Sequence, residues 1–217
     1  ELTELDVVRH YTRLSQWNFN IDTNFYPLGS CTMKYNPKIN ETLARLPGFA
    51  QHHPMTPDSD SQGSLQLMYE LQECLKTISG MDHASLQPAA GAQGEFAGML
   101  MIQAYHSANG NPRKKVLLPD SAHGTNPASA TLCGYKPVQL PSNAEGTIDV
   151  AKLESAMDEE TAAIMLTNPN TLGMFEKDIL KVCEIVHKKG GLVYCDGANL
   201  NAIMGIAKMG HMGVDVL

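Results

Sequence analysis

Short apolar segments alternate with helix-like segments along most of this chain, and no other feature of the sequence limits the fold as strongly. From residue 83 onward, stretches such as KVLLP and AAIMLT are separated by segments in which apolar residues recur with a helical period. Short strands joined by helices form parallel sheets. The alternation therefore predicts an α/β fold with a mostly parallel sheet and helices on both faces.

Element boundaries follow from apolar periodicity and from turn residues. Thr3 and Asp6 are spaced for a capping box at the first helix, and Gly80 and Gly190 stand where helices are expected to end. The expected strands are 83–88, 114–119, 136–141, 162–167 and 191–195, and the expected helices are 2–15, 63–80, 91–108, 126–134, 149–158 and 176–190.

The chain is expected to have two parts, a helical arm (1–80) and a sheet domain (81–217). Within the arm, 17–36 contains FYPLGSCTMKYNP, which is rich in turn formers and in aromatic side chains. Such a segment differs from a solvated linker, so we expect it to pack against another surface. A strand that has only just begun at Val214 leads us to expect that the chain is part of a longer protein.

Composition excludes several classes of function. With 43% apolar residues, the 217 residues suffice for a packed core. A net charge of −7 disfavours nucleic acid and anionic membranes as partners. The chain has no apolar run long enough to span a bilayer, and its five cysteines form no CxxC pair, so we expect no metal cluster and a reducing, cytoplasmic location.

Two segments at expected strand ends could bind a flat anionic ligand. In AAGAQGE, Gly91 and Gly94 would let backbone N–H groups at a helix N-terminus approach a phosphate. In DSAHGTNPAS, His123 could stack on a ring. Each has an ordinary alternative: glycines that only permit a tight turn, and a histidine that bonds its own loop. The turn NPNTLG (168–173) is likewise explained by turn chemistry alone.

Asp196 ends the apolar strand of VYCDGANLNA, and no Lys or Arg follows to pair with it. An isolated Asp-Gly pair is often only a turn. Here no second strand follows to form a hairpin, and the same sheet edge offers the anion cradle and His123. Pyridoxal phosphate has a phosphate, an aromatic ring and a cationic ring nitrogen, so it would use all three. We therefore expect Asp196 to pair with the ring N–H.

Five motifs in order resemble the glycine-decarboxylating P-protein family of the glycine cleavage system, particularly subunit 2 of its two-subunit bacterial form. They are FYPLGSCTMKYNPK, AAGAQGE, DSAHGTNPAS, TNPNTLGMFE and YCDGANLNA. The resemblance implies the fold type I of pyridoxal-phosphate enzymes, that of the aspartate aminotransferase superfamily. Residues 81–217 would then be the cofactor-binding large domain, and the arm that contains Cys31 would lie near the active site.

The resemblance also assigns roles to residues of this chain. It implies His123 and Asp196 as catalytic residues that also contact the cofactor, and Ala198 as packing under the ring. It places the cofactor phosphate near Ala92 and Gln93. The full set of expected cofactor contacts is Gly91, Ala92, Gln93, His123, Thr171, Asp196, Ala198 and Asn199. Cys31 could equally be a buried small hydrophobe, so its role is left open.

The family's Schiff-base lysine follows the counterpart of GVDVL, so we expect it beyond Leu217 and expect these 217 residues alone to be inactive. Lys208 is not its counterpart, and we expect it on the solvent side of a short helix.

The activity that the resemblance implies is decarboxylation of glycine, with transfer of the aminomethyl group to the lipoyl group of the H-protein. Subunit 1 would be a further partner, in a heterotetramer in the bacterial cytoplasm. Two alternatives stay open: a non-catalytic partner subunit, and another fold type I enzyme such as a cysteine desulfurase or a decarboxylase.

Overall fold

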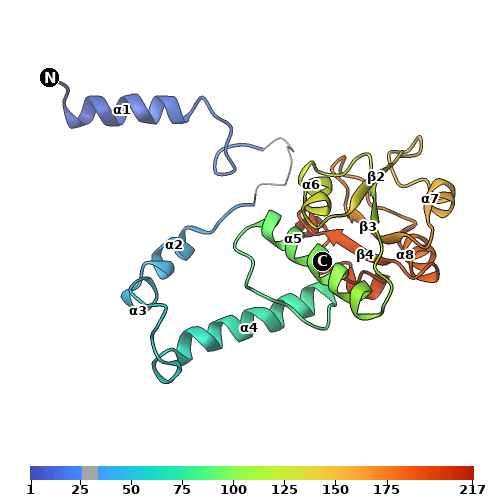
Figure 1. The fold of residues 1–217 in the computed structure, drawn as a ribbon. Coiled ribbons are helices and arrows are strands. Elements are labelled where there is room, and N and C mark those ends of the chain that lie inside the picture. The colour runs from blue at the N-terminus through green and yellow to red at the C-terminus, as the bar shows by residue number, and fades with distance from the viewer. Residues whose placement is uncertain (26–33) are drawn as a thin grey trace. The chain divides into compact units, whose positions relative to one another are not determined.

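The computed structural model describes residues 1–25 and 34–217, and Figure 1 follows its elements along the chain. These residues form two compact units, Glu1–Met55 and Thr56–Leu217. The expected functional division after residue 80 stays a prediction. No described helix is both long enough and apolar enough to cross a membrane.

The first unit consists of short helices. They are α1 (Glu4–Ser15), α2 (Lys38–Ala44) and α3 (Pro47–Ala50). The predicted capping box is confirmed, because the Thr3 hydroxyl accepts from Asp6 N and the Asp6 carboxylate accepts from Thr3 N. The side chains of Trp17, Phe19 and Phe25 are exposed. That the segment 17–36 packs against another surface stays a prediction, and Cys31 lies outside the described residues.

The second unit contains the sheet. Its helices are α4 (Gln62–Ser79), α5 (Gly91–Ala108), α6 (Thr125–Leu132), α7 (Val150–Ala156) and α8 (Ile179–Lys188), with short 3₁₀ turns at Asp58–Asp60, Leu200–Ala202 and Gly210–Met212. Its strands are β1 (Lys115–Pro119), β2 (Lys136–Leu140), β3 (Thr161–Thr167) and β4 (Leu192–Asp196). They lie in the order β2-β1-β3-β4, and every neighbouring pair is parallel. The predicted parallel sheet is confirmed.

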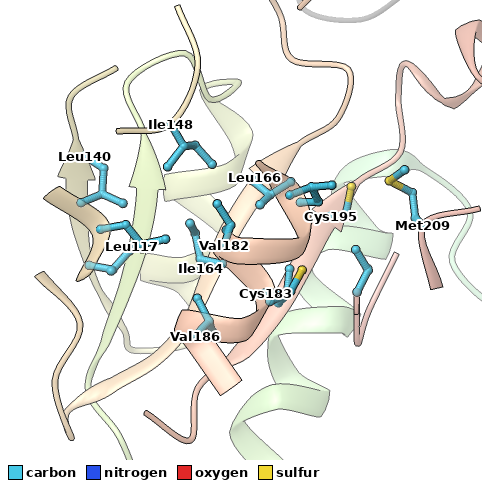
Figure 2. Packing of buried hydrophobic residues seen from close by; sticks show 14 of the residues in the cluster. Leu117, Leu140, Ile148, Ile164, Leu166, Val182, Cys183, Val186, Cys195 and Met209 are labelled. Atoms are coloured by element: carbon cyan, nitrogen blue, oxygen red, sulfur yellow. The ribbon is translucent and has the colours of Figure 1, made fainter. Parts of the chain in front are cut away.

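Helices cover both faces of this sheet, as the alternation predicted. Successive side chains of a strand point to opposite faces, so Val116 and Leu118 of β1 pack with α5 and α6, whereas Leu117 packs with α7 and α8. Figure 2 shows the apolar residues on the face covered by α7 and α8, where Leu117 and Ile164 of the sheet pack against Val182 and Val186 of α8. The sheet is thus buried on both sides, and its strand ends remain for a site.

The strand expected at 83–88 is wrong, because those residues have no regular secondary structure. The side chain of Gln72 donates to the carbonyl oxygen of Ala84 at 2.8 Å, which removes one acceptor that a neighbouring strand would need. Pro88 also lacks an N–H. Lys208 is exposed as predicted, but it lies in an irregular segment rather than in a helix.

The end of α4 meets a later part of the chain. Gly80 closes α4 with φ +74°, a left-handed conformation that favours glycine. A Cβ built on Gly210 would lie 2.1 Å from the carbonyl oxygen of Gly80. The two backbones can therefore approach this closely only because residue 210 has no side chain.

The two outer strands of the sheet, β4 and β2, differ in how their backbone N–H groups are satisfied. Alongside β4, Cys195 N donates to Val216 O at 2.8 Å, and Val193 N donates to the Asp215 carboxylate at 2.7 Å. His187 Nε2 lies 2.8 Å from that same carboxylate. At the opposite edge, β2 contains Pro137, which has no N–H to offer.

Candidate functional site

The carboxyl ends of the parallel strands gather most of the sequence-predicted site residues. His123 follows β1, Thr171 follows β3, and Asp196 is the last residue of β4, with Ala198 and Asn199 directly after it. Because β1, β3 and β4 are neighbours that run in the same direction, these loops lie along one edge of the sheet. Ligands of open α/β sheets bind at this edge.

Hydrogen bonds connect the loops to one another. The Thr171 hydroxyl donates to the carbonyl oxygen of Ser121, which joins the loop after β3 to the loop after β1. The Asn199 amide nitrogen donates to Pro169 O at 2.9 Å and to Asn170 O at 3.3 Å, which joins the loops after β4 and β3. The edge is therefore a connected surface rather than a set of independent loops.

The N-terminus of α5 leaves backbone donors without a side-chain cap. Ala90 is the N-cap residue, and no side-chain capping hydrogen bond is present among the residues that the structure describes. A Cβ built on Gly91 would meet nothing within 4 Å, so packing does not explain the glycine. The Gln93 side chain accepts from Ala89 N at 2.9 Å and is thereby held within its own turn. A phosphate at Gly91, Ala92 and Gln93 stays a prediction.

His123 is half-buried and bonded to a residue two positions later. Its Nδ1 lies 2.6 Å from the Thr125 hydroxyl oxygen and 3.3 Å from Thr125 N. The Thr125 hydroxyl in turn donates to the Glu95 carboxylate at 2.7 Å, and Ser129 donates to the other carboxylate oxygen at 3.1 Å. Sequence reasoning missed Glu95, although it is the one Asp or Glu in the apolar stretch 91–108 and could have been noticed for that reason.

Asp196 has a free carboxylate oxygen at the end of β4. Its Oδ1 accepts from Ala198 N at 2.9 Å, which is the bond of a local turn. Within residues 1–25 and 34–217, no hydrogen bond engages Oδ2 and no Lys or Arg forms an ion pair with Asp196. The turn interpretation thus accounts for one oxygen only, and a partner for the other is open.

Several buried polar atoms near this edge have no hydrogen-bond partner in the described chain. They are Thr167 Oγ1, Asn168 Nδ2, Asn199 Oδ1 and both amide atoms of Asn126. Burying such atoms unpaired costs about 1–3 kcal/mol each. Because the Asn199 nitrogen is already committed to two carbonyl oxygens, its free oxygen can only accept a hydrogen bond from a further donor.

A buried acid supports the loop after β3. Glu176 is 3% exposed; its carboxylate accepts from Ile148 N at 3.0 Å, and Asn170 Nδ2 lies 3.4 Å from its other oxygen. Glu176 N donates to Asn168 Oδ1 at 3.1 Å. Burial raises the pKa of the Glu176 carboxyl, and the hydrogen bond from Ile148 N opposes that rise.

Glu176 is expected to make stability fall as pH rises. Its folded pKa lies above the ordinary value of 4.5, so between the two values the folded protein binds more protons than the unfolded chain. The contribution to the free energy of unfolding is therefore complete below pH 4.5 and is lost as pH rises through the folded pKa. In Glu176→Gln this slope, at most about 1.4 kcal/mol per pH unit, is expected to disappear.

Urea unfolding of the full-length protein at a series of pH values from about 4.5 upward measures how the free energy of unfolding changes with pH. Glu154→Gln, at an exposed glutamate, is the matched control and should keep the parent slope. Equal pH slopes in Glu176→Gln and the parent protein would contradict the prediction.

The buried thiols are unsuited to nucleophilic chemistry. Burial raises the pKa of Cys195 to about 12 and that of Cys183 to about 11, so both stay protonated near neutral pH. No group of three or more His, Cys, Asp or Glu side chains in the described ranges could hold a metal ion.

Three kinds of similarity accompany this geometry. The protein-family model described as beta-eliminating lyase matches residues 50–211. Over its whole length, the chain is 61% identical to the probable glycine dehydrogenase (decarboxylating) subunit 2 of Methylococcus capsulatus and 59% identical to that of Listeria monocytogenes. It spans about 45% of the length of each of these curated relatives.

Among solved structures, the crystal structure of glycine decarboxylase (P-protein) of the glycine cleavage system in inhibitor-bound form matches with a TM-score of 0.76 and 25% identity. The match covers 99% of this chain and 47% of that one. The sheet and its helices have the fold type I arrangement of pyridoxal-phosphate enzymes, which confirms the predicted fold class, and the resemblance drawn from the five motifs is confirmed as well.

Proposed function

The chain belongs to the beta-eliminating lyase family, and we propose that, within its full-length protein, it decarboxylates glycine with pyridoxal phosphate. The aminomethyl group that remains would pass to the lipoyl group of the H-protein. Two subunit 2 relatives at about 60% identity support this choice within the family. Glycine has no β-carbon, so β-elimination itself is chemically closed to this substrate.

The observation that carries the proposal is the unpaired carboxylate of Asp196. Asp196 is half-buried at the end of a buried strand, and no hydrogen bond or Lys or Arg of the described residues engages its Oδ2, so this oxygen is open to a cationic ligand. A protonated ring nitrogen would supply that charge. Asp196 would then hold the proton on the nitrogen, whose pKa the carboxylate raises.

The other residues at this edge fit pyridoxal phosphate too. The uncapped N-terminus of α5 offers backbone N–H groups to a phosphate. The free Asn199 oxygen could accept from a hydroxyl group. When bound, pyridoxal phosphate supplies an electron sink for the carbanion left by loss of CO2.

The chain's own side chains would orient this chemistry. His123 would lie against the ring face, and Thr171 and Ala198 would line the ring from the loops after β3 and β4. Their loops are tied together by the bond from Thr171 to Ser121 and by the two bonds from Asn199. The resemblance places the lysine that attaches the cofactor beyond Leu217.

The proposed assembly contains subunit 1 as a partner, in a heterotetramer, with lipoylated H-protein as the second substrate. Residues 1–80 would form the arm near the active site, and residues 81–217 the cofactor-binding part. We also propose a cytoplasmic location in a bacterium, which the relatives' organisms and the cysteine spacing support.

The test is glycine-dependent CO2 release by the full-length protein with subunit 1, lipoylated H-protein and pyridoxal phosphate. Release of labelled CO2 from carboxyl-labelled glycine is expected only when the H-protein carries its lipoyl group. Omitting the lipoyl group is the matched control.

Parallel assays with other substrates separate the alternatives. Release of sulfide from cysteine, or of pyruvate from serine, in place of CO2 from glycine would overturn the proposal in favour of another family member's reaction. Activity of subunit 1 alone, unchanged when this subunit is added, would instead identify it as a non-catalytic partner.

A further inference from the structure

A buried acid behind His123 has no assigned role. Glu95 lies in α5 and is 7% exposed. No Lys, Arg or His forms an ion pair with it in the described part of the chain, and its carboxylate oxygens contact two hydroxyl groups, those of Thr125 and Ser129. A buried carboxylate is retained at a cost, so the contacts that it makes indicate what it does.

With the Glu95 carboxylate ionised, the number of hydrogens on these groups sets the direction of each hydrogen bond. An ionised carboxylate can only accept, so both hydroxyl groups must donate to Glu95. The Thr125 hydroxyl has a single hydrogen, which is then spent on Glu95 Oε1 at 2.7 Å. Toward His123 Nδ1, 2.6 Å away, the same oxygen can therefore only accept.

We propose that Glu95, acting through the Thr125 hydroxyl, holds the hydrogen of the neutral His123 ring on Nδ1. The lone pair of the ring is then on Nε2, the nitrogen that neither Thr125 nor Glu95 contacts. Glu95 and Thr125 are positioning residues in this arrangement, because neither touches the ring face.

A second contact to His123 Nδ1 makes the position of the ring hydrogen depend on Glu95. The Thr125 N–H group is directed at His123 Nδ1 at 3.3 Å, and it can only donate. That donor favours the opposite tautomer, with the hydrogen on Nε2. His123 Nδ1 can donate to the Thr125 hydroxyl oxygen, the shorter of the two contacts, only while the hydrogen of that hydroxyl group is bonded to Glu95. Without Glu95, both groups of Thr125 can donate to Nδ1, and the tautomer is expected to reverse.

The consequence for catalysis rests on the proposed function. With the lone pair on Nε2, His123 can accept a proton or a hydrogen bond from a bound substrate at that atom. With the tautomer reversed, the same atom is a donor and cannot do so. General acid–base steps contribute roughly 10²–10⁴-fold, so loss of the correct tautomer is expected to lower kcat by about 10-fold or more and to change KM little.

The experiment is ¹⁵N NMR of histidine-labelled full-length protein without cofactor, at a pH where the His123 ring is neutral. The His123 signals are assigned by their loss in His123→Asn. In the parent protein, Nδ1 is expected to carry the hydrogen. Glu95→Ala should move it to Nε2, although residue 95 does not contact the ring. Glu95→Gln should retain the parent tautomer, because an amide oxygen still accepts from Thr125.

Two further variants keep the test decisive if Glu95→Ala folds poorly. Thr125→Val removes the acceptor and keeps the backbone donor, so it should also reverse the tautomer. Ser129→Ala removes the other partner of the same carboxylate and should leave the tautomer unchanged. The inference is overturned if the parent protein already has its hydrogen on Nε2, or if neither Glu95→Ala nor Thr125→Val moves it. Because no cofactor or substrate is present, that result is independent of whether glycine is the substrate.

Discussion

Asp196→Asn in the full-length protein is expected to lower glycine decarboxylation by roughly 10²–10³-fold. Because Asp196 is only half-buried, the loss is expected at the lower end of what breaking a buried charge pair costs, about 3–4 kcal/mol, and each tenfold change is about 1.4 kcal/mol. Asn still accepts from Ala198 N, so the turn after β4 should persist. What is lost is the negative charge that would keep the ring nitrogen of the cofactor protonated. Labelled CO2 release measures the effect.

Asp178→Asn is the matched control, because Asp178 is exposed at the start of α8 and its side chain makes no capping hydrogen bond. It should retain parental activity. Circular dichroism of both variants should match the parent protein. Near-parental CO2 release by Asp196→Asn would remove the basis for the proposed cofactor contact, whatever the cofactor content.

Gly210→Ala is expected to destabilise the sheet-containing unit by roughly 3 kcal/mol, at the upper end of what overpacking costs. The new Cβ would lie 2.1 Å from Gly80 O and 2.5 Å from Gly80 C, both backbone atoms that cannot rotate away. Relief requires the end of α4 to separate from the turn at Gly210–Met212. The midpoint of urea unfolding, with an unchanged m-value, measures the loss.

Gly63→Ala is the control for glycine replacement as such. Gly63 lies in α4 with φ outside the left-handed region, and a Cβ there would meet nothing within 4 Å. Alanine is the better helix former, so this variant should be unchanged or more stable by up to about 1 kcal/mol. A Gly210→Ala protein as stable as Gly63→Ala would show that the close approach near Gly80 is not maintained in solution.

The order of strands and helices was largely predictable, because burial on both faces makes strands such as AAIMLT continuously apolar and leaves amphipathic helices between them. Local chemistry also sufficed for the Thr3 capping box and for the end of α4 at Gly80. The strand predicted at 83–88 does not form, because a strand needs a neighbouring strand to hydrogen-bond with and the sequence does not reveal whether one is present. The Gln72 side chain donates to the Ala84 carbonyl oxygen instead.

The site was predictable only in part. Residues directly after strands, such as Asp196 and His123, could be placed at one edge from topology alone. Glu95 could be noticed as the lone acid of an apolar helix, but its place behind His123 could not be predicted, because it depends on contacts with Thr125 and Ser129, about thirty residues further along the chain. The hydrogen bonds from Asn199 to Pro169 O and Asn170 O likewise depend on how β3 and β4 align. Contacts of this range follow from packing and are not visible in any local pattern.

The two edges of the sheet bear on how the protein avoids self-association. An open edge strand offers unpaired N–H and C=O groups to any other strand, and proteins protect such edges in specific ways. Beside β4, the segment through Asp215 and Val216 occupies the N–H groups of Val193 and Cys195. On β2, Pro137 lacks the donor and Lys136 adds charge. Among the described residues, neither β2 nor the outer side of β4 thus offers a full row of unpaired N–H groups for intermolecular strand pairing, while the strand ends stay accessible for a ligand.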